Sequence, residues 1–527
     1  MISAGEGNLH LRQAALANQL GQWQQSEAIA RAYLRSSGDD PLALAILGDA
    51  LVGQRRAVDA EKVFRRAIRA DRRSAPARLG LSRTLELQCR IREAVRPLDD
   101  LLAEQPDRAD IWEQLAQLLG RAQRFDRAIE AHEQVLHLNG DNPRVWLEYA
   151  LALRFGGRSS DALQALRRSL ELDASYAPAW WVMATIAPDA ISDADLAQIE
   201  GALAKAGHDQ IQRFLHIALA TVLDYRREFE RAYRHFAAGK AIGASGSRHD
   251  PGQLERYTAA AIQRFDKQFF DEREGFGARS DAPIFIVGLP RSGSTLVERI
   301  LGGHSKIEAA GELPVIPSLI DLLEAETQKR SGYRDLLPNL TASRATELGD
   351  LYLARAQEYR TTEKPFFVDK LHMNWMHVAF IRLILPNARI IDVRRDALDC
   401  CWSNFKAIFT SGHPAADDLG HIGHFYRQYV RMMDHAASWR EGAILNVSYD
   451  ALVADIDRET RRMTAFLGLE FEPACLEFHR LQKPAATFSA EQVRRPLNRE
   501  GIGRWKPYRA WLGPLFDALG PLAAMDA

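Results

Sequence analysis

Cysteine, long apolar runs and an excess of one charge are what this sequence has least of. Four cysteines in 527 residues are too few and too scattered for a disulfide framework, and they do not have the spacing of zinc ligands. No run of about 18 apolar residues is present to span a membrane. The net charge of −1 argues against a chain whose surface as a whole binds nucleic acid or a membrane. We therefore expect no metal site, no nucleic-acid partner and no membrane span.

The composition is that of a soluble globular protein, with 46% hydrophobic and 26% charged residues. A chain of 527 residues is too long for one ordinary domain of about 150 residues, so several domains are expected. The first ten residues have neither the basic start nor the apolar core of a signal peptide. A cytoplasmic, reducing location is therefore the expectation.

The N-terminal half contains an internal repeat that is marked by proline. Intervals of 35, 30, 37 and 35 residues separate Pro41, Pro76, Pro106, Pro143 and Pro178. A period of about 34 residues is that of the tetratricopeptide repeat, in which each unit is a helix–turn–helix. Small residues recur where two helices would approach closely, and Trp, Leu or Phe recur where a stacked core would lie. Residues 1–245 thus resemble a tetratricopeptide array and are predicted to form an all-α solenoid.

An array of this type presents a concave groove, which the family uses to bind peptides or partner proteins. We expect an acceptor substrate or a partner protein there, and a scaffold or dimerisation surface without a ligand is the alternative. A homodimer is left open. Residues 246–282 begin and end with small and polar residues but keep a helical pattern between them, which predicts a helical connector.

Residues 283–301 have the pattern of a phosphate-binding turn. An unbroken apolar run over 284–287 predicts a strand that is buried on both faces of a parallel sheet. A glycine-bearing turn over 288–293 follows, and Ser294 or Thr295 begins a helix. A strand, a glycine turn and a helix N-terminus direct backbone N–H groups toward a bound phosphate.

The turn has the spacing of the triphosphate-binding loop G-x-x-x-x-G-K-[ST], but Ser294 stands where the lysine should be. Without that lysine the β- and γ-phosphates of a triphosphate lose their main cationic partner. Phosphate binding is therefore retained as a prediction, whereas a kinase or NTPase is disfavoured.

From residue 283 onward, short apolar runs alternate with helical segments, which is typical of a parallel α/β sheet. Further strands are expected at 365–369, 389–393 and 443–447. Ligands of open parallel sheets bind at the carboxyl ends of the strands, and basic or hydroxyl residues follow each of these runs. We predict a P-loop-like α/β domain with a central parallel sheet over 283–527, which binds a nucleotide carrying separate phosphates.

This pattern resembles the sulfotransferases, in the branch that holds the tyrosylprotein sulfotransferases and bacterial proteins joining tetratricopeptide repeats to a sulfotransferase domain. That family transfers a sulfonate group from 3′-phosphoadenosine 5′-phosphosulfate (PAPS) and uses no metal. Its motif Pro-Arg-Ser-Gly-Thr-Thr corresponds to 290–295 here, with a serine in place of the first threonine. The resemblance implies that the 5′-phosphosulfate end is bound by Arg291, Ser292, Gly293, Ser294 and Thr295.

The resemblance also assigns the other donor contacts. In the family, an arginine followed eight residues later by a serine holds the 3′-phosphate, and Arg395 and Ser403 match this spacing. Arg394 is a less suitable neighbour, because Trp402 lies eight residues after it. Three more positions resemble residues near the nucleotide: Tyr449, Asn498 and Arg504. The family usually has a lysine at the last of these, so the geometry of Arg504 differs.

Three residues match catalytic positions of the family: Glu312, Lys370 and Ser489. The base of the tyrosylprotein branch is a glutamate 21 residues after the loop arginine, which is Glu312 here, although Gly311 replaces the first glutamate of the family's Gly-Glu-Glu turn. Lys370 matches the lysine that neutralises the leaving oxygen, and Ser489 matches the serine that assists it. Cytosolic sulfotransferases use a histidine as base, so His372 is the alternative, followed by His304.

We therefore expect a PAPS-dependent sulfotransferase. Its acceptor hydroxyl would belong to a peptide tyrosine, a carbohydrate, a lipid or a small alcohol, with the repeats recruiting the acceptor or a partner. A repeat-based adaptor with a nucleotide-binding but inactive domain is the alternative, and a kinase is the third hypothesis.

Overall fold

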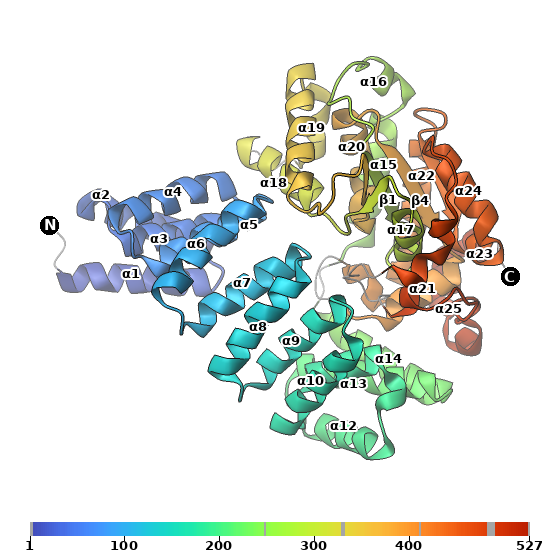
Figure 1. The fold of residues 1–527 in the computed structure, drawn as a ribbon, viewed down its shortest axis with the longest axis horizontal. Helices are drawn as coiled ribbons and strands as arrows, with labels where there is room; N and C mark the ends of the chain where they lie inside the picture. The colour runs from blue at the N-terminus through green and yellow to red at the C-terminus, as the bar shows by residue number, and fades with distance from the viewer. Residues whose placement is uncertain (1–3, 247–248, 328–331, 410–412, 482–490, 525–527) are drawn as a thin grey trace. The chain divides into compact units, whose positions relative to one another are not determined.

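The computed structural model describes residues 4–246, 249–327, 332–409, 413–481 and 491–524 (Figure 1). The chain packs as two units. Unit 1 contains Met1–Asn139 and Pro314–Arg360, and unit 2 contains Gly140–Leu313 and Thr361–Ala527. The domain boundaries expected at 245/246 and 282/283 follow the change in sequence pattern and stay a prediction.

Unit 1 consists of helices of the repeat type and of two helices from later in the sequence. The repeat helices are α1 (Ala4–Gln19), α2 (Trp23–Ser37), α3 (Pro41–Gly53), α4 (Ala57–Ala70), α5 (Ala75–Leu87), α6 (Ile91–Glu104), α7 (Ala109–Arg121) and α8 (Phe125–Asn139). The later helices are α18 (Val315–Thr327) and α19 (Ala342–Gln357). Ser318 of α18 donates from its Oγ to the Leu87 carbonyl at the end of α5, at 2.9 Å.

The turns inside the helix pairs repeat with the expected period. Positive φ angles recur every 34 residues, at Gly21, Arg55, Cys89, Gln123 and Gly157. A residue in the left-handed region just after a helix satisfies the last carbonyls and reverses the chain direction. This regular spacing confirms the helical repeats that the proline intervals predicted.

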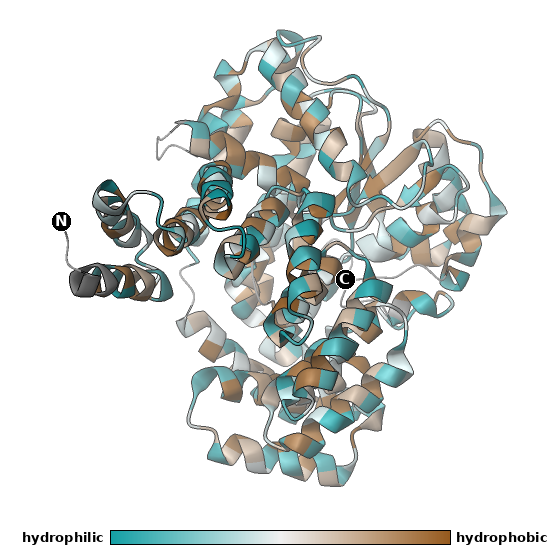
Figure 2. Ribbon diagram, turned by 60° about the vertical axis from the view of Figure 1, so that its left-hand side comes forward, coloured by the Kyte–Doolittle hydropathy of each residue, from teal (hydrophilic) through white to brown (hydrophobic). Residues whose placement is uncertain are grey.

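Small residues hold the helices of unit 1 close together. A Cβ on Gly48 would lie 2.5 Å from the Phe64 ring, and one on Gly80 would lie 2.2 Å from the same ring. Phe64 is fully buried between these two glycines. The side chain of any larger residue would therefore push the helices apart. In Figure 2 the helices are teal on one side and brown on the other, as expected for amphipathic elements.

Unit 2 begins with more helices of the repeat type. They are α9 (Pro143–Phe155), α10 (Ser159–Leu172), α11 (Ala177–Ile186), α12 (Asp193–Lys205), α13 (Asp209–Tyr225) and α14 (Phe229–Ser245). Asn142 caps α9 by accepting a hydrogen bond from the Arg144 N–H at 3.0 Å, and Pro143 occupies the first helical position. Two helices follow, α15 (Pro251–Arg264) and α16 (Lys267–Asp271), within the range that was expected to be a connector.

A parallel five-stranded sheet forms the centre of the rest of unit 2. Its strands are β1 (Pro283–Gly288), β2 (Ile307–Ala309), β3 (Phe366–Asp369), β4 (Arg389–Arg394) and β5 (Ile444–Ser448). The order across the sheet is β2-β3-β1-β4-β5, and each pair of neighbouring strands is parallel. The register places Gly288, the last residue of β1, beside Val393 of β4. The predicted α/β domain and its parallel sheet are thus confirmed.

Strand β2 is the strand that the sequence pattern missed. It has only three residues, and its central residue is Glu308. This buried carboxylate accepts hydrogen bonds from the Thr361 N–H and Oγ1, at 2.6 and 2.9 Å, and from the Thr362 Oγ1 at 2.8 Å. A charged residue that is satisfied by partners about fifty positions away leaves no apolar run to detect.

Helices flank the sheet. They are α17 (Ser294–Gly302), α20 (Val378–Ile384), α21 (Ala397–Lys406), α22 (Leu419–Ala437), α23 (Tyr449–Ala454), α24 (Ile456–Phe466) and α25 (Gly513–Leu519). Five short 3₁₀ helices matter for the site: η4 (His372–His377), η5 (Pro414–Asp417), η6 (Pro473–Arg480), η7 (Gln492–Arg494) and η8 (Lys506–Trp511). One buried cluster joins the inner residues of β1, β3 and β4 to α17 and η7. Within the described residues, no helix combines the length and the apolar character needed to cross a membrane.

Candidate functional site

The candidate residues lie directly after the strands of the sheet. Arg291 follows β1, Glu312 follows β2, Lys370 follows β3, Arg395 follows β4 and Tyr449 follows β5. Because the strands are parallel, their carboxyl ends meet at the same edge of the sheet. The topology therefore brings five segments that are distant in sequence to one edge.

The turn between β1 and α17 has an unusual backbone. Arg291 has a φ of 68° and Gly293 has a φ of 101°. A non-glycine residue in the left-handed region is uncommon and is held there only by its surroundings. Gly288 is just as constrained, because a Cβ on it would lie 2.6 Å from the Val393 carbonyl oxygen of β4. The predicted phosphate-binding turn is thus a tightly fixed loop ahead of a helix N-terminus.

Helix α21 holds this turn from one side. Asn404 Nδ2 donates to the Pro290 carbonyl at 2.7 Å, and the Cys400 thiol lies 3.7 Å from the same oxygen. Arg291 Nε donates to the Ser403 Oγ at 3.1 Å. Ser403 and Asn404 lie three and four residues after Cys400, so the three side chains share one helix face.

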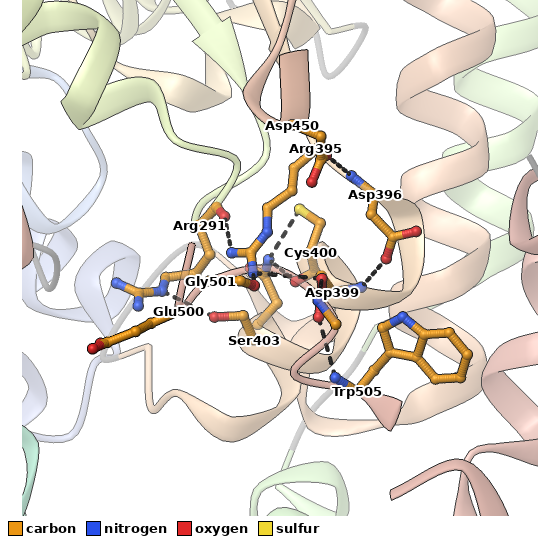
Figure 3. Close-up of polar contacts among 12 residues, drawn as sticks. Arg291, Arg395, Asp396, Asp399, Cys400, Ser403, Asp450, Glu500, Gly501 and Trp505 are labelled. Atoms are coloured by element: carbon orange, nitrogen blue, oxygen red, sulfur yellow. Dashed lines mark hydrogen bonds and ion pairs between the residues drawn. The ribbon is translucent and has the colours of Figure 1, made fainter. Parts of the chain in front are cut away.

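Arg395 connects the turn to the C-terminal part of the chain (Figure 3). Its guanidinium donates to the Arg291 carbonyl at 3.3 Å and to the Gly501 carbonyl, and it lies 3.8 Å from the Asp399 carboxylate. It also lies 5.1 Å from the centre of the Tyr449 ring. The two residues predicted to hold a 3′-phosphate, Arg395 and Ser403, therefore both contact Arg291.

Tyr449 fits between two glycines. A Cβ on Gly293 would lie 2.5 Å from the Tyr449 ring, and one on Gly501 would lie 2.8 Å from the Tyr449 hydroxyl. Burial raises the pKa of the Tyr449 phenol, so it is neutral at physiological pH. The ring thus packs on the turn as a flat neutral wall.

The charges of this cluster favour a bound anion. Burial and the charges of Arg395 and Arg154 lower the pKa of Arg291 to about 10, so Arg291 is still a cation at neutral pH. Among the described residues, the buried Ser292 Oγ and Arg395 Nε have no hydrogen-bond partner. Such groups are costly to bury unless a ligand or water satisfies them. Cations, an unpaired hydroxyl and a helix N-terminus together are the donor set that suits phosphate and sulfate groups.

Asp399 is a part of the site that sequence reasoning missed. Its carboxylate is buried and accepts hydrogen bonds from the Gly503 N–H at 2.6 Å and from the Trp505 N–H at 3.1 Å. These bonds attach residues 501–505 to α21, where Gly501 also meets Arg395 (Figure 3). Its position four residues after Arg395, on the same helix face as Ser403, is the signal that could have revealed it.

Glu312 and Lys370 form a close ion pair. Lys370 Nζ lies 2.5 Å from Glu312 Oε1 and 3.9 Å from Glu298 Oε2 of α17. The lysine side chain is 2% exposed, whereas that of Glu312 is 34% exposed. Burial opposes ionisation of the glutamate, but Lys370 and His372 outweigh it and lower the pKa of Glu312. The carboxyl is therefore ionised at neutral pH, in the form that can accept a proton.

The departure from the family turn at Gly311 has a local reason. Gly311 has a φ of 83°, and its carbonyl accepts a hydrogen bond from the Lys370 N–H at 2.8 Å. Glycine adopts this left-handed backbone without the cost that a glutamate would carry. The substitution therefore fits the turn that presents Glu312.

The two alternative bases differ in their surroundings. His372 follows Lys370 closely, and burial lowers the pKa of its imidazole below the usual 6.5. His304 is buried on another side, where its Nε2 lies 3.0 Å from the Glu470 carbonyl and its Nδ1 accepts from the Lys306 N–H at 3.1 Å. His372 is thus the histidine near Glu312, while His304 hydrogen-bonds with backbone groups of Glu470 and Lys306.

Two candidates, Asn498 and Arg504, make no hydrogen bond or ion pair with these groups within the described residues. Ser489 lies outside the described residues. Asn498 is exposed, and its Oδ1 accepts from the Glu500 N–H at 3.1 Å. Arg504 is also exposed. No group of three or more His, Cys, Asp or Glu side chains that could hold a metal ion occurs in the part of the chain that the structure describes.

Fold and site together define a protein with helical repeats and an α/β domain whose first strand leads into a phosphate-binding type of turn. Residues 283–473 match the model of the sulfotransferase family. Residues 11–76, 51–118 and 121–186 match two models of the tetratricopeptide repeat. The chain therefore contains tetratricopeptide repeats followed by a sulfotransferase-family domain.

Curated relatives match this chain at low identity. An uncharacterized protein of Aquifex aeolicus (strain VF5) is 30% identical over 311 residues, which are 57% of this chain and 40% of that protein. A putative protein-tyrosine sulfotransferase of Caenorhabditis briggsae is 25% identical over 231 residues, covering 42% of this chain and 80% of the relative. Protein-tyrosine sulfotransferase A of Caenorhabditis elegans is 22% identical over 264 residues, covering 48% of this chain and 70% of the relative.

The matches cover the chain and its relatives only in part. The alignment spans less than half of the Aquifex protein, 40% of its length. A solved MamA structure from Desulfovibrio magneticus RS-1 aligns with 33% of this chain and 99% of its own, at 16% identity and a TM-score of 0.30. That score is too low to support a structural conclusion.

Proposed function

We propose that the protein transfers a sulfonate group from PAPS to a hydroxyl acceptor. The observation that carries the proposal is the contact of Arg291 with both Ser403 and Arg395, at one edge of a sheet that also presents the Glu312–Lys370 pair. The match of residues 283–473 to the sulfotransferase family also supports the proposal.

In this proposal the donor is held at its two ends by separate cations. Arg291 and the backbone N–H groups of the turn bind the 5′-phosphosulfate, together with Ser292, Ser294 and Thr295. Arg395 and Ser403 bind the 3′-phosphate, and Tyr449 packs beside the nucleotide. Asn498 and Arg504 would cover the nucleotide from the C-terminal segment.

Transfer forms a bond between the acceptor oxygen and sulfur and breaks the bond between sulfur and the 5′-phosphate oxygen. Glu312 accepts the proton that the acceptor hydroxyl loses, and Lys370 opposes the negative charge that gathers on the phosphate oxygen. A general base contributes about 10²–10⁴-fold to the rate, and a preorganised cation or donor contributes about 10²–10³-fold. Ser489 would assist Lys370.

The acceptor class follows from the relatives rather than from the site. Several of them are named protein-tyrosine sulfotransferases, which makes a peptide tyrosine the first acceptor to test. A carbohydrate, a lipid or a small alcohol would need the same base and the same donor site. In each case the tetratricopeptide repeats would recruit the acceptor or a partner protein.

The experiment is incubation of the purified full chain with sulfur-labelled PAPS and a cell extract, with the Lys370→Ala variant as control. We expect label on a macromolecule or small alcohol with the natural chain and a loss of about 100-fold or more with the variant. Tight binding of PAPS without any transfer would support the adaptor with an inactive domain instead.

A further inference from the structure

A helix of the repeats contacts the C-terminal segment at a buried ion pair. Arg154, in the last turn of α9, donates from Nε and Nη2 to the two carboxylate oxygens of Glu491, at 2.8 and 2.9 Å. The two side chains are 3% and 19% exposed. A two-bond pair between a planar guanidinium and a carboxylate fixes the orientation of both groups.

A second arginine crosses the same contact in the opposite direction. Arg494 donates from its guanidinium to the carbonyl oxygens of Arg154 and Phe155, both at 3.3 Å. These carbonyls are among the last of α9, at the helix end that carries partial negative charge, and the Arg154 carbonyl also accepts from the Gly157 N–H at 3.1 Å. The end of α9 and residues 491–494 are therefore joined by charged groups on both sides.

The joined segment also packs on the helix that begins at the phosphate-binding turn. Val493 is buried in the same apolar cluster as Leu296, Val297 and Ile300 of α17. Helix α17 starts at Ser294, directly after the turn. A displacement of residues 491–494 would therefore disturb the packing of α17.

The charge of Arg154 also acts on Arg291 of the phosphate-binding turn. Besides burial and Arg395, Arg154 is a positive charge that lowers the pKa of Arg291. Two cations that destabilise one another in a buried setting both stabilise an anion placed between or beside them.

We propose that Arg154, supplied by the repeats, is a positioning residue of the donor site, which holds residues 491–494 against α17, the helix that begins at the phosphate-binding turn. The ligand class is a nucleotide with phosphate or phosphosulfate groups, and this identity rests on the proposed function. The repeats then complete the donor site in addition to any part they play in binding an acceptor.

The test is calorimetric titration of the full-length chain with adenosine 3′,5′-bisphosphate. The Arg154→Met variant is expected to bind about 10–100-fold more weakly at low salt, as expected for loss of charged hydrogen bonds. Arg154→Lys keeps the charge but loses the two-bond geometry. Its affinity should therefore lie between that of the natural chain and that of Arg154→Met.

Two further variants separate this role from a general loss of structure. Glu491→Gln keeps both arginine charges but loosens the segment, and it should weaken binding while the chain stays folded by circular dichroism. Arg144→Met removes an arginine from the same helix, where it pairs with Glu148 at 2.7 Å, and should leave the affinity unchanged.

The outcomes are distinct. The role of Arg154 would be overturned if Arg154→Met and Glu491→Gln stay folded and bind adenosine 3′,5′-bisphosphate as tightly as the natural chain. It would also be overturned if Arg144→Met loses as much affinity as Arg154→Met. Failure of the unmodified chain to bind adenosine 3′,5′-bisphosphate at all would overturn the proposed function together with this inference.

Discussion

A carboxylate and an ammonium at the ends of neighbouring strands carry the proposed chemistry. Glu312 follows β2 and Lys370 follows β3, which is paired with β2 in the sheet. The Lys370 Nζ lies between two carboxylates, close to Glu312 and farther from Glu298. This arrangement keeps Lys370 positively charged and Glu312 negatively charged, which are the forms that a base and a charge-stabilising group need.

Replacing Glu312 by glutamine tests the base. Glutamine has nearly the same shape but cannot take up the acceptor's proton, so we expect the rate of transfer to fall about 10²–10⁴-fold. The affinity for adenosine 3′,5′-bisphosphate, measured by calorimetry, should stay within a factor of two or so of the natural value. Glu347→Gln is the matched control, because Glu347 pairs with Arg344 on α19 and its side chain is 65% exposed. Full activity in Glu312→Gln would move the base to His372.

The pH dependence of kcat/KM gives an independent test. The base must be ionised, and the pKa of Glu312 is lowered from the ordinary 4.5 by Lys370 and His372, which outweigh the opposing effect of burial. The rate should therefore be constant through neutral pH and fall only as the pH drops below 4.5. Circular dichroism at each pH is the check that the chain stays folded. An acidic limb centred clearly above that value would point to a histidine base.

At the scale of elements, helix α21 organises the donor side of the site. One of its faces contacts the phosphate-binding turn through Cys400, Ser403 and Asn404, and Asp399 attaches residues 501–505 to it. The turn itself depends on Gly293, which has a positive φ and lies against Tyr449. Small changes at this contact should therefore act on donor binding more than on folding elsewhere.

Gly293→Ala is expected to abolish donor binding. The added Cβ would lie 2.5 Å from the Tyr449 ring, at a φ of 101° that alanine rarely adopts. We expect the affinity for adenosine 3′,5′-bisphosphate to fall at least about 100-fold, which corresponds to about 3 kcal/mol of strain and lost contacts. Gly513→Ala serves as control, because nothing lies within 4 Å of a Cβ built there. Equal affinities in the two variants, measured by calorimetry, would contradict the role of the turn.

Much of this arrangement follows from local sequence patterns. The apolar run before Gly288 predicts β1 and the proline intervals predict the repeats, and both patterns depend on neighbouring residues, so they are visible in the sequence. The place of Arg395 and Ser403 in the donor site was implied by the resemblance to the sulfotransferases. Strand β2 was missed because its central Glu308 is satisfied by Thr361 and Thr362.

The contacts of Asp399 and Arg154 also could not be predicted from the sequence. Asp399 binds backbone N–H groups more than 100 residues away, and Arg154 pairs with Glu491 at a separation of 337 residues. Such contacts are set by the tertiary fold and leave no periodic signal. The roles of Ser489, Asn498 and Arg504 stay predictions from the resemblance alone.

At the scale of the whole molecule, the repeats divide between the two units. Helices α1–α8 belong with 314–360 to unit 1, while α9–α14 belong with the sheet to unit 2. In unit 2, Lys240 of α14 is buried and donates to Asp417 Oδ1 at 2.9 Å, and Arg213 of α13 contacts the same carboxylate at 2.8 Å. The later repeats are therefore part of the structure that carries the site.

Substitution of Asp224 in α13 is the clearest test of whether the later repeats stabilise α21. It accepts hydrogen bonds from Lys406 Nζ of α21 at 2.9 Å and from the Tyr508 hydroxyl at 2.6 Å. Asp224→Ala leaves both donors without this partner, so we expect the free energy of unfolding in urea to fall by about 1–3 kcal/mol.

The control and the pH dependence sharpen this test. Asp193→Ala removes a carboxylate that is 92% exposed and pairs with Arg226, so it should change stability by less than about 0.5 kcal/mol. Burial opposes ionisation of Asp224, but Lys406 and Tyr508 lower its pKa below the ordinary 3.8. Its contribution is therefore complete above that value and is lost as the pH falls through the lowered pKa. Equal effects of the two substitutions would show that α13 does not brace α21.

The most direct test of the central claim is a calorimetric comparison of adenosine 3′,5′-bisphosphate with ATP–Mg²⁺, on the natural chain and on Arg395→Ala. The account predicts that the bisphosphate binds more tightly than ATP–Mg²⁺ and that Arg395→Ala loses at least about 10-fold in affinity for it, because a charged hydrogen-bonding group is removed. Absence of bisphosphate binding beside tight ATP–Mg²⁺ binding would contradict the account and favour a kinase.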